Sequence, residues 1–254
     1  MTRVLVISPA YNEAASLPAV IQDLRAHYPA ADPLVVNDGS TDGTAFIAQG
    51  LGVPVLDLPY NLGIGGAVQT GLLYAARERY AYAVRYAYAV QFDGDGQHRA
   101  DQLGALLAPV IAGRADVAIG SRFLLPNAYQ VPLARRCGIA IFRAVNALII
   151  GQTITDNTSG FRAYGRDALT FLAREYPHDY PEPESVVTLC RNGFRIVEVP
   201  TTMRERQGGR SSITLFRSIY YMCKVLLAIG VRATGRRVGR VQDESAHPDY
   251  LGSR

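Results

Sequence analysis

Short apolar runs alternate along this chain with polar turns and with stretches in which apolar residues recur at helical spacing. Each run is too short for a helix and usually ends in a turn rich in Gly, Asn, Asp or Ser, which is typical of a buried strand. The predicted strands are residues 3–8, 34–36, 53–58, 88–92, 115–119 and 194–199. Because strand and helix alternate three times from the N-terminus, the pattern predicts an α/β fold with a mostly parallel sheet flanked by helices.

Helical segments separate these strands. We predict that the first helix begins at a Ser16 cap, with Pro18 in its first turn and an apolar face that includes Val20, Ile21 and Leu24. Further helical segments are predicted after the glycine-rich turn 61–66, over 100–112, 132–150 and 166–173, after Glu184, and over 213–231.

The chain contains no stretch of linker-like composition. We therefore predict a single domain over residues 1–212, an apolar and basic helical extension over 213–242, and a disordered tail over 243–254. Residues 79–84 repeat as 85–90 and lengthen the approach to the strand at 88–92. A repeat of even length preserves the alternation of side chains between the two faces of a strand.

The apolar run 88–92 stops abruptly at Asp93-Gly94-Asp95-Gly96-Gln97-His98. Two carboxylates one residue apart face opposite ways on a strand, but glycines allow a turn that brings them together. A divalent cation would remove their repulsion, and oxygen ligands suit Mg²⁺ or Mn²⁺. The alternative is a plain surface turn, since Asp-Gly is among the commonest turn signals.

The composition is that of a folded protein with a sizeable core: 254 residues, 48% hydrophobic and 19% charged. The net charge of +4 is modest, although four arginines crowd together near the C-terminus, at positions 232, 236, 237 and 240. Such a cluster fits an anionic partner or a solvated tail, and we do not predict nucleic-acid binding from it. The turn 63–66 lacks the full Gly-x-Gly-x-x-Gly spacing and follows the third strand, which excludes a Rossmann dehydrogenase.

The cysteines and the apolar runs bear on the compartment. Cys137, Cys190 and Cys223 are far apart and fit neither a zinc site nor a disulfide framework, which favours a reducing compartment. The N-terminus leads directly into a strand, and no apolar run reaches the ~18–20 residues that span a bilayer. We therefore expect a cytoplasmic protein that can still rest on the inner face of the cell membrane.

Several turns, in chain order, resemble the motifs of one enzyme family. They are 9–13, 36–42, the Asn61 glycine turn, 93–98, 120–122, 156–162 and 206–212. Together they are similar to the inverting GT-A glycosyltransferases of family 2, and look most like the polyprenyl-phosphate sugar synthases (dolichyl-phosphate mannose or glucose synthase type). The resemblance implies a GT-A (Rossmann-like) fold, a nucleotide-sugar donor and a divalent metal.

Carried over position by position, the resemblance also implies roles for particular residues. The nucleotide-sugar would be bound by Pro9, Tyr11, Glu13, Asp38, Asp93, Gln97, Arg206 and Ser211. Mg²⁺ or Mn²⁺ would be held by Asp93, Asp95 and Gln97, and His98 would have a structural hydrogen-bonding role. The acceptor phosphate would meet Arg122, Arg135, Arg136 and Arg210, because a guanidinium matches phosphate oxygens and stays charged.

The favoured function is transfer of mannose or glucose from a GDP- or UDP-sugar to a polyprenyl phosphate, with Asp95 and Arg122 as catalytic residues. A phosphate acceptor is ionised at neutral pH and needs no base, whereas an alcohol acceptor does. The second reading is therefore a hydroxyl-directed glycosyltransferase with Glu182 or Glu184 as base. Either glutamate could instead stabilise the start of the following helix through its dipole. A third reading is a nucleotide-sugar-binding scaffold without activity.

Two apolar helical stretches, 132–150 and 213–231, lie next to arginines. They could rest in the headgroup region of a membrane beside anionic lipid. Alternatively, they pack on the sheet or on a second copy of the chain in a homodimer.

Overall fold

The computed structural model describes residues 3–77, 86–125, 147, 151–177 and 180–204, together with residues 224, 227 and 230. The strands are β1 (Val4–Ala10), β2 (Ala31–Asn37), β3 (Val55–Asp57), β4 (Tyr88–Gln91), β5 (Val117–Ser121), β6 (Arg162–Gly165) and β7 (Ile196–Pro200). The helices are α1 (Leu17–His27), α2 (Thr44–Gly50), α3 (Gly63–Arg77), α4 (Leu103–Ile111), α6 (Arg166–Glu175) and α7 (Pro181–Arg191), with a 3₁₀ turn, η2, at Ala100–Gln102.

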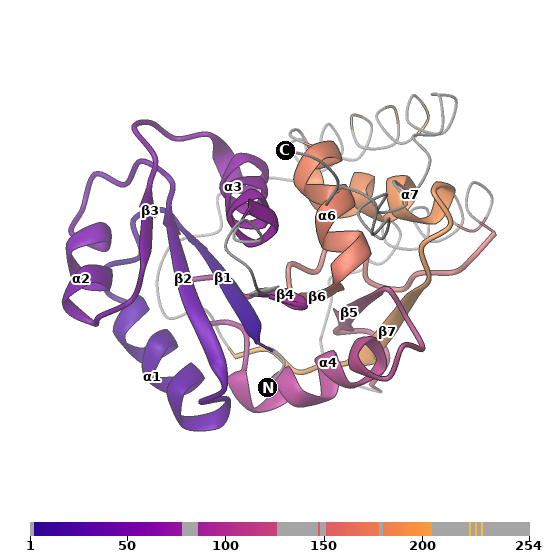
Figure 1. Ribbon diagram of the computed structural model, residues 1–254, viewed down its shortest axis with the longest axis horizontal. Helices are drawn as coiled ribbons and strands as arrows, with labels where there is room; N and C mark the ends of the chain where they lie inside the picture. The colour runs from indigo at the N-terminus through magenta and orange to yellow at the C-terminus, as the bar shows by residue number, and fades with distance from the viewer. Residues whose placement is uncertain are drawn as a thin grey trace, which may run out of the picture.

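The strands form one sheet of seven, in the order β3-β2-β1-β4-β6-β5-β7 (Figure 1). Helices α3, α6 and α7 lie on one side of it, and α1, α2 and α4 on the other (Figure 1). Side chains of β1 alternate between the two layers: Leu5 and Ile7 join the core beneath α3 and α6, and Val4 and Val6 join the core with α1 and α4. A strand that is covered on both faces must be apolar throughout, which is why β1 reads as an unbroken hydrophobic run.

The order of the strands creates a crevice at one edge of the sheet. From β1 the chain moves outward through β2 to β3, and then returns through α3 to β4 on the other side of β1. All these neighbours pair in parallel, so the turns that follow β1 and β4 leave the same edge of the sheet. Ligands of open α/β sheets bind at such a switch point, outside the carboxyl ends of the strands.

The sequence did not predict strand β6. The stretch 156–162 was expected to be a polar turn that led into a helix, but Arg162–Gly165 pairs antiparallel with both β4 and β5. All four residues of β6 are buried, including the Arg162 side chain. Strand β6 is short and begins with a charged residue, so its pattern carries no hydrophobic signal. The expected mostly parallel sheet is nevertheless confirmed.

The predicted cap at Ser16 is wrong in its chemistry. Helix α1 does begin after Ser16, but this hydroxyl makes no capping hydrogen bond. Its Oγ lies 2.7 Å from the Glu13 carboxylate and 2.8 Å from the Gly94 carbonyl oxygen. The hydroxyl therefore connects the turn after β1 to the turn after β4, a long-range contact that a local capping rule does not foresee.

Several predictions concern residues outside the described part of the chain. The first copy of the repeat, the apolar stretch 132–150, the extension 213–242 and the tail 243–254 fall wholly or almost wholly outside it. In the part that is described, no helix has the length and apolar character that crossing a bilayer requires.

The packing of α3 on β1 depends on a glycine. A Cβ added to Gly71 would lie 2.3 Å from the Ile7 Cγ2 atom, in the buried core. We expect Gly71→Ala to lower the free energy of unfolding by about 1–3 kcal/mol, because Ile7 is branched next to its backbone and cannot swing away. Urea unfolding measures the difference.

Gly104→Ala is the matched control, since Gly104 also lies in a helix but has nothing within 4 Å of an added Cβ. Here alanine should raise the stability by about 0.5–1 kcal/mol. Equal effects of the two substitutions would contradict close packing of α3 against β1.

Candidate active site

A cavity of about 260 Å³ opens at the carboxyl ends of β1 and β4. Its lining includes six residues that the sequence predicted for the site: Pro9, Tyr11, Glu13, Asp38, Asp93 and Asp95. These residues come from three separate turns, so the fold brings together what the sequence spreads over more than eighty positions. The cavity is large enough for part of a small-molecule ligand.

The turns that follow β1 and β2 are joined by hydrogen bonds. The Asn12 N–H donates to Ser40 Oγ (2.9 Å), and Asn12 Oδ1 accepts from the Thr41 N–H (2.8 Å). The Glu13 N–H donates to Thr44 Oγ1 at 2.9 Å. Asn12 has a φ of 57°, in the left-handed region that Asn tolerates better than most residues. One wall of the cavity is therefore a fixed double turn.

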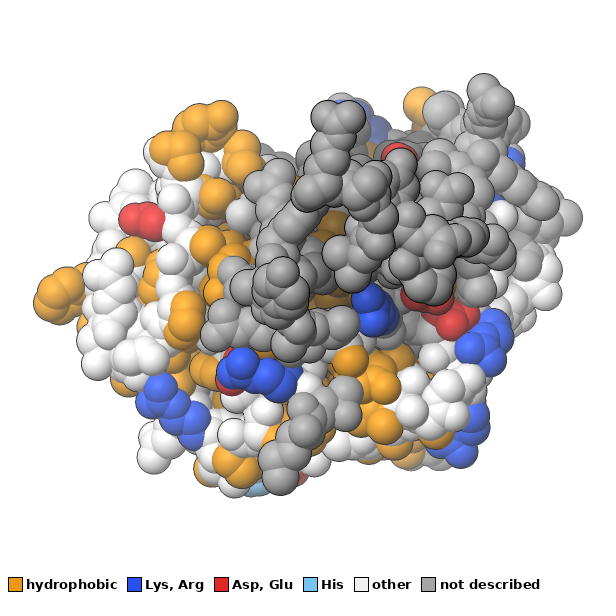
Figure 2. All heavy atoms as spheres, viewed as in Figure 1, with side chains coloured by type: hydrophobic (Ala, Val, Ile, Leu, Met, Phe, Trp, Pro, Cys, Tyr) orange, Lys and Arg blue, Asp and Glu red, His pale blue; other side chains and the backbone are white. Residues whose placement is uncertain are grey.

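A third turn, between β3 and α3, is anchored on Asp38. The Asp38 Oδ1 atom accepts from the Leu62 N–H at 2.7 Å. Gly39 has a φ of 65°, and a Cβ there would lie 2.6 Å from backbone atoms of Tyr60 and Asn61. Figure 2 shows apolar side chains gathered at the end of the molecule where β3 leads into α3. Tyr60 and Leu62 are exposed in this stretch, as is Ile64, which also lines the cavity.

Asp93 is held by His98. The Asp93 Oδ2 atom and His98 Nε2 are 3.0 Å apart, and the buried imidazole stacks on Phe161 with ring centroids 5.0 Å apart. Burial raises the pKa of Asp93, but His98, Gln91 and Arg122 together outweigh this effect and hold the pKa below the ordinary 3.8. Asp93 is thus ionised at neutral pH, and the hydrogen-bonding role predicted for His98 is confirmed.

The two aspartates share a glycine turn, as the sequence suggested. Gly94 donates to the Pro9 carbonyl oxygen at 3.2 Å, and Gly96 has a φ of 77°. The Gln97 N–H donates to Asp95 Oδ1 at 3.0 Å, which fixes the side chain of Asp95 against its own turn. Asp93 and Asp95 therefore both line the cavity.

The donor set of this turn fits a hard divalent cation. The Asp93 Oδ1 atom is buried without a hydrogen-bond partner among the described residues, while Oδ2 is held by His98. Among the described residues, no three or more His, Cys, Asp or Glu side chains are arranged so that they alone could hold a metal ion. A Mg²⁺ or Mn²⁺ ion would need further oxygen ligands, which Gln97, water and a diphosphate can supply.

The loop that precedes β6 packs against Asp93. A Cβ added to Gly160 would lie 2.8 Å from Asp93 Oδ2, so no larger residue fits there without displacing the carboxylate. Arg162 holds this loop from beneath, since it donates to the carbonyl oxygens of Ser159 (2.7 Å) and Asn157 (2.9 Å) and to Ser185 Oγ (2.8 Å). No separate role for Arg162 follows from the sequence pattern.

The structure separates the two candidate bases on α7. Glu184 is buried, and its Oε1 atom accepts from the Tyr180 N–H at 3.2 Å, at the start of the helix. Burial raises the pKa of Glu182 above the ordinary 4.5, Arg162 partly offsets this effect, and the charge of Asp93 adds to it. The carboxylate of Glu182 therefore interacts electrostatically with Asp93.

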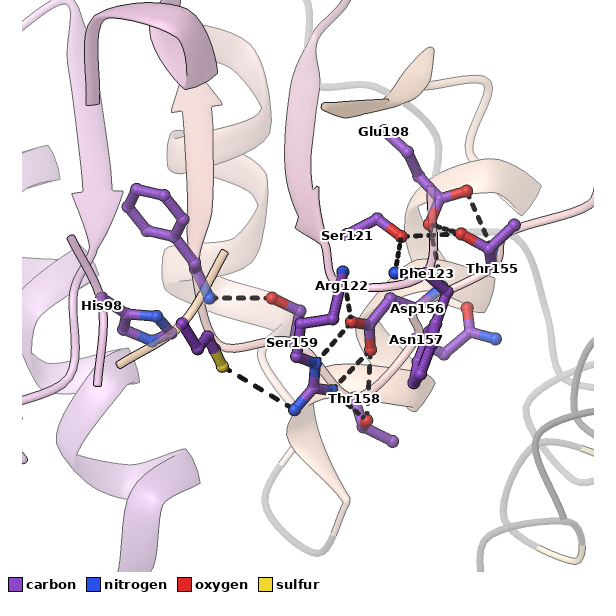
Figure 3. Close-up of polar contacts among 12 residues, drawn as sticks. His98, Ser121, Arg122, Phe123, Thr155, Asp156, Asn157, Thr158, Ser159 and Glu198 are labelled. Atoms are coloured by element: carbon purple, nitrogen blue, oxygen red, sulfur yellow. Dashed lines mark hydrogen bonds and ion pairs between the residues drawn. The ribbon is translucent and has the colours of Figure 1, made fainter. Parts of the chain in front are cut away.

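Arg122 follows β5 and is held by Asp156 (Figure 3). Its Nε donates to Asp156 Oδ2 at 2.6 Å and its Nη2 to Asp156 Oδ1 at 2.7 Å. The same Nη2 donates to Thr158 Oγ1 at 2.9 Å. The charge of Arg122 also contributes to the low pKa of Asp93. The other predicted phosphate and nucleotide ligands, Arg135, Arg136, Arg206, Arg210 and Ser211, lie outside the described residues.

A second cavity, of about 350 Å³, lies at the opposite edge of the sheet. Arg3, Asp32 and Tyr86 are among its lining residues, and Arg3 pairs with Asp32 at 2.7 Å. The predicted site residues of the described chain do not contribute to it. The larger cavity therefore lacks the carboxylates that define the smaller one.

The segment after β7 contacts the turn that carries Asp93, Asp95 and Gln97. The Arg204 N–H donates to the Gln97 carbonyl oxygen at 2.9 Å, and the Arg204 guanidinium pairs with Asp23 of α1 at 3.0 Å. Asp23 also accepts from the Ala100 N–H at 3.1 Å. Burial raises the pKa of Asp23, but Arg204 and Ala100 outweigh this effect and keep the pKa below the ordinary 3.8.

Sequence comparison finds relatives along most of the chain. The model described as Glycosyl transferase family 2 matches residues 5–172. Polyprenol monophosphomannose synthase of Mycolicibacterium smegmatis is 33% identical over 224 residues, which cover 84% of this chain and 81% of that protein. Undecaprenyl-phosphate mannosyltransferase of Micrococcus luteus is 36% identical over 222 residues, which cover 84% of this chain and 88% of that protein.

Solved structures confirm the fold. Glucosyl-3-phosphoglycerate synthase of Mycobacterium tuberculosis, crystallised with Mn²⁺, UDP-glucose and phosphoglyceric acid, is similar with a TM-score of 0.64. The match covers 91% of this chain and 79% of that one at 20% sequence identity. At this identity the likeness establishes the fold, which is the expected GT-A arrangement.

The contact between Arg204 and Asp23 predicts a pH-dependent stability. A group whose pKa is lower in the folded state stabilises the fold above its unfolded pKa and loses this effect as the pH falls through the folded pKa. We expect Asp23→Asn to cost about 1–2 kcal/mol at pH 7. The difference from wild type should shrink progressively below about pH 4, as urea unfolding at several pH values would measure.

Asp101→Asn is the control, because Asp101 pairs with Arg99 at the surface, where each of the two side chains is more than a third exposed. Such pairs contribute little, about 0–1 kcal/mol. A loss in Asp23→Asn that stays constant from pH 7 to pH 3 would contradict the proposed source of the stability.

Proposed function

The chain belongs to glycosyltransferase family 2, and from that premise we propose that it transfers a hexose, mannose or glucose, from a GDP- or UDP-sugar to a polyprenyl phosphate. The observation that carries the proposal is the position of Arg122. This arginine is held at the end of β5, and its charge reaches Asp93 at the cavity. This electrostatic effect supports a site in which a guanidinium, which suits a phosphate acceptor, acts together with the carboxylates that suit a metal and a diphosphate.

The donor would occupy the cavity. Pro9, Tyr11, Glu13 and Asp38 line it on the side of the double turn and would bind the nucleoside. From outside the described residues, Arg206 and Ser211 are proposed to complete the donor site. Asp93, Asp95 and Gln97 would hold Mg²⁺ or Mn²⁺, which when bound would neutralise the diphosphate as it leaves.

The acceptor phosphate would approach from the side of Arg122. A phosphate is already ionised at neutral pH, so it can attack the anomeric carbon in line with the leaving diphosphate and needs no general base. Arg122 would offset the repulsion between two anionic reactants, together with Arg135, Arg136 and Arg210. Three named relatives support this acceptor class: a polyprenol monophosphomannose synthase, an undecaprenyl-phosphate mannosyltransferase and a UDP-N-acetylglucosamine–dolichyl-phosphate N-acetylglucosaminyltransferase.

The direct test uses the purified protein, Mn²⁺ or Mg²⁺, a polyprenyl phosphate and a panel of radiolabelled GDP- and UDP-hexoses. We expect one donor to label the organic phase, and the label to disappear when EDTA removes the metal. Asp95→Ala should reduce labelling by at least about a hundredfold, because even the outer partners of metal ligands are worth 10–100-fold. Labelling that survives both EDTA and Asp95→Ala would contradict the metal site, and donor hydrolysis without labelled lipid would contradict the acceptor.

A second candidate function is transfer to a hydroxyl. The observation in its favour is Glu182, because burial and the charge of Asp93 raise its pKa, as is common for a general base. Glu184 was an equal candidate from the sequence, but its carboxylate is engaged at the start of α7. A scaffold without activity, the third sequence-based reading, gains no support from membership of an enzyme family.

Glu182→Gln distinguishes the two acceptor classes. If the acceptor is a phosphate, we expect lipid labelling by the variant to stay within about tenfold of wild type, because no proton has to be removed. A general base contributes about 10²–10⁴-fold, so a hydroxyl-directed enzyme should lose that much while its donor affinity is unchanged. Glu184→Gln serves as control, since it alters the start of the same helix without changing the charge beside Asp93.

A further inference from the structure

We propose that Glu198, on the edge strand β7, is a positioning residue that fixes Arg122 at the site through Thr155 and Asp156 (Figure 3). This inference rests on the proposed function, in which Arg122 serves the acceptor phosphate. Glu198 lies outside every motif from which the site was predicted, and it contacts neither the cavity lining nor Arg122 in the contacts described for it.

The Glu198 carboxylate binds two successive residues of the loop before β6. Its Oε2 atom accepts from the Thr155 N–H at 2.8 Å. Its Oε1 atom accepts from the Thr155 hydroxyl at 2.6 Å and from the Asp156 N–H at 2.8 Å. Hydrogen bonds from backbone N–H groups to a carboxylate are directional and strong, so the backbone at these two residues is fixed relative to β7.

Asp156 passes this position on to Arg122. The Asp156 side chain is 0% exposed, and its two oxygens accept from Nε and Nη2 of Arg122 in a bidentate arrangement. Asp156 Oδ2 also accepts from the Arg122 N–H at 3.1 Å. The Asp156 carboxylate therefore holds both the main chain and the guanidinium of Arg122. The backbone N–H of Asp156 is itself bound by Glu198.

A second contact fastens the same loop to β5. Ser121 Oγ and Thr155 Oγ1 are 2.7 Å apart, and Thr155 Oγ1 in turn donates to Glu198. Strands β5 and β7 pair in parallel, with Ile119 opposite Glu198. Strand β7, which carries Glu198, is thus joined to the end of β5 in two ways. One is the pairing of the two strands, and the other is the contact through Thr155.

The chemical consequence concerns where the positive charge lies. An arginine side chain has many rotamers, and a site that fixes it beforehand spends less binding free energy on ordering it when a ligand arrives. Arg122 is 19% exposed while Asp156 is fully buried, so the pair is open to solvent on the arginine side. We expect Glu198 to govern affinity for the acceptor phosphate without affecting the donor.

The competing explanation is that Glu198 only stabilises a loop. The chain offers a matched control at the other end of the same two strands. There Asp116 accepts from the Arg195 N–H at 2.7 Å and from the Arg195 guanidinium, which joins the starts of β5 and β7. Asp116→Asn removes a more exposed carboxylate–arginine contact at the opposite ends of these strands, and should leave transfer kinetics as in wild type.

The experiment compares Glu198→Gln, Asp156→Asn and Asp116→Asn as full-length folded proteins, with KM for polyprenyl phosphate and Kd for the donor. Glutamine keeps the shape of Glu198, but its amide NH₂ would face a backbone N–H of Thr155 or Asp156, so that two donors meet. We therefore expect KM for the acceptor to rise about 2–10-fold. Asp156→Asn weakens charged hydrogen bonds, and the rise should be about 10–100-fold. The donor Kd should not change in either variant.

A second readout does not depend on turnover. The Nε–H group of Arg122, assigned in ¹⁵N spectra by its absence in Arg122→Lys, should exchange slowly with solvent in wild type and faster in Glu198→Gln and Asp156→Asn. Unchanged exchange in Glu198→Gln would overturn the proposal, whatever the acceptor is. Faster exchange with an unchanged acceptor KM, or parallel changes in donor and acceptor constants, would also overturn it. If wild type labels no lipid, the proposed function fails separately, and the exchange rates still decide whether Glu198 positions Arg122.

Discussion

The 3.0 Å contact between Asp93 Oδ2 and His98 Nε2 is the interaction on which the rest of this site depends. It allows an ionised carboxylate to follow directly on an apolar central strand, where an unpaired charge would be costly. His98 in turn stacks on Phe161, whose ring also packs against Phe92. The packed rings of His98, Phe161 and Phe92 fix the turn that carries Asp93 to the loop before β6. Gly160 of that loop therefore lies against Asp93.

Buried charged side chains near the site have hydrogen-bond partners. Arg162 is fully buried, yet it donates to two carbonyl oxygens and one hydroxyl. Asp156 is buried against Arg122, and Glu198 is bound by N–H and hydroxyl donors. A buried charge is tolerated when its hydrogen bonds are satisfied, and removing one partner costs more than the pair contributes. The loop over Asp93 is therefore fixed by these polar contacts as well as by the packing of Phe161.

The sequence was sufficient for the parts of the fold that local patterns encode. Buried strands such as β1 and β4 are unbroken apolar runs, and the Gly and Asp residues after them mark the turns of the site. Strand β6 and the roles of Arg162 and Glu198 were missed for one physical reason. Strand β6 and Glu198 depend on partners more than twenty residues away, as does the contact of Arg162 with Ser185. A buried arginine and a glutamate within a strand carry no local sign of those partners.

Two glutamates in one turn of α7 have different surroundings. Residues two apart on a helix point about 200° away from each other, as follows from 3.6 residues per turn. Glu184 consequently meets the start of its own helix, whereas Glu182 senses Asp93 and Arg162. An ionised Glu182 would repel an anionic acceptor, but burial favours its neutral form and Arg162 offsets its charge when it is ionised. A phosphate can therefore be accommodated beside a carboxyl group that a hydroxyl acceptor would need as a base.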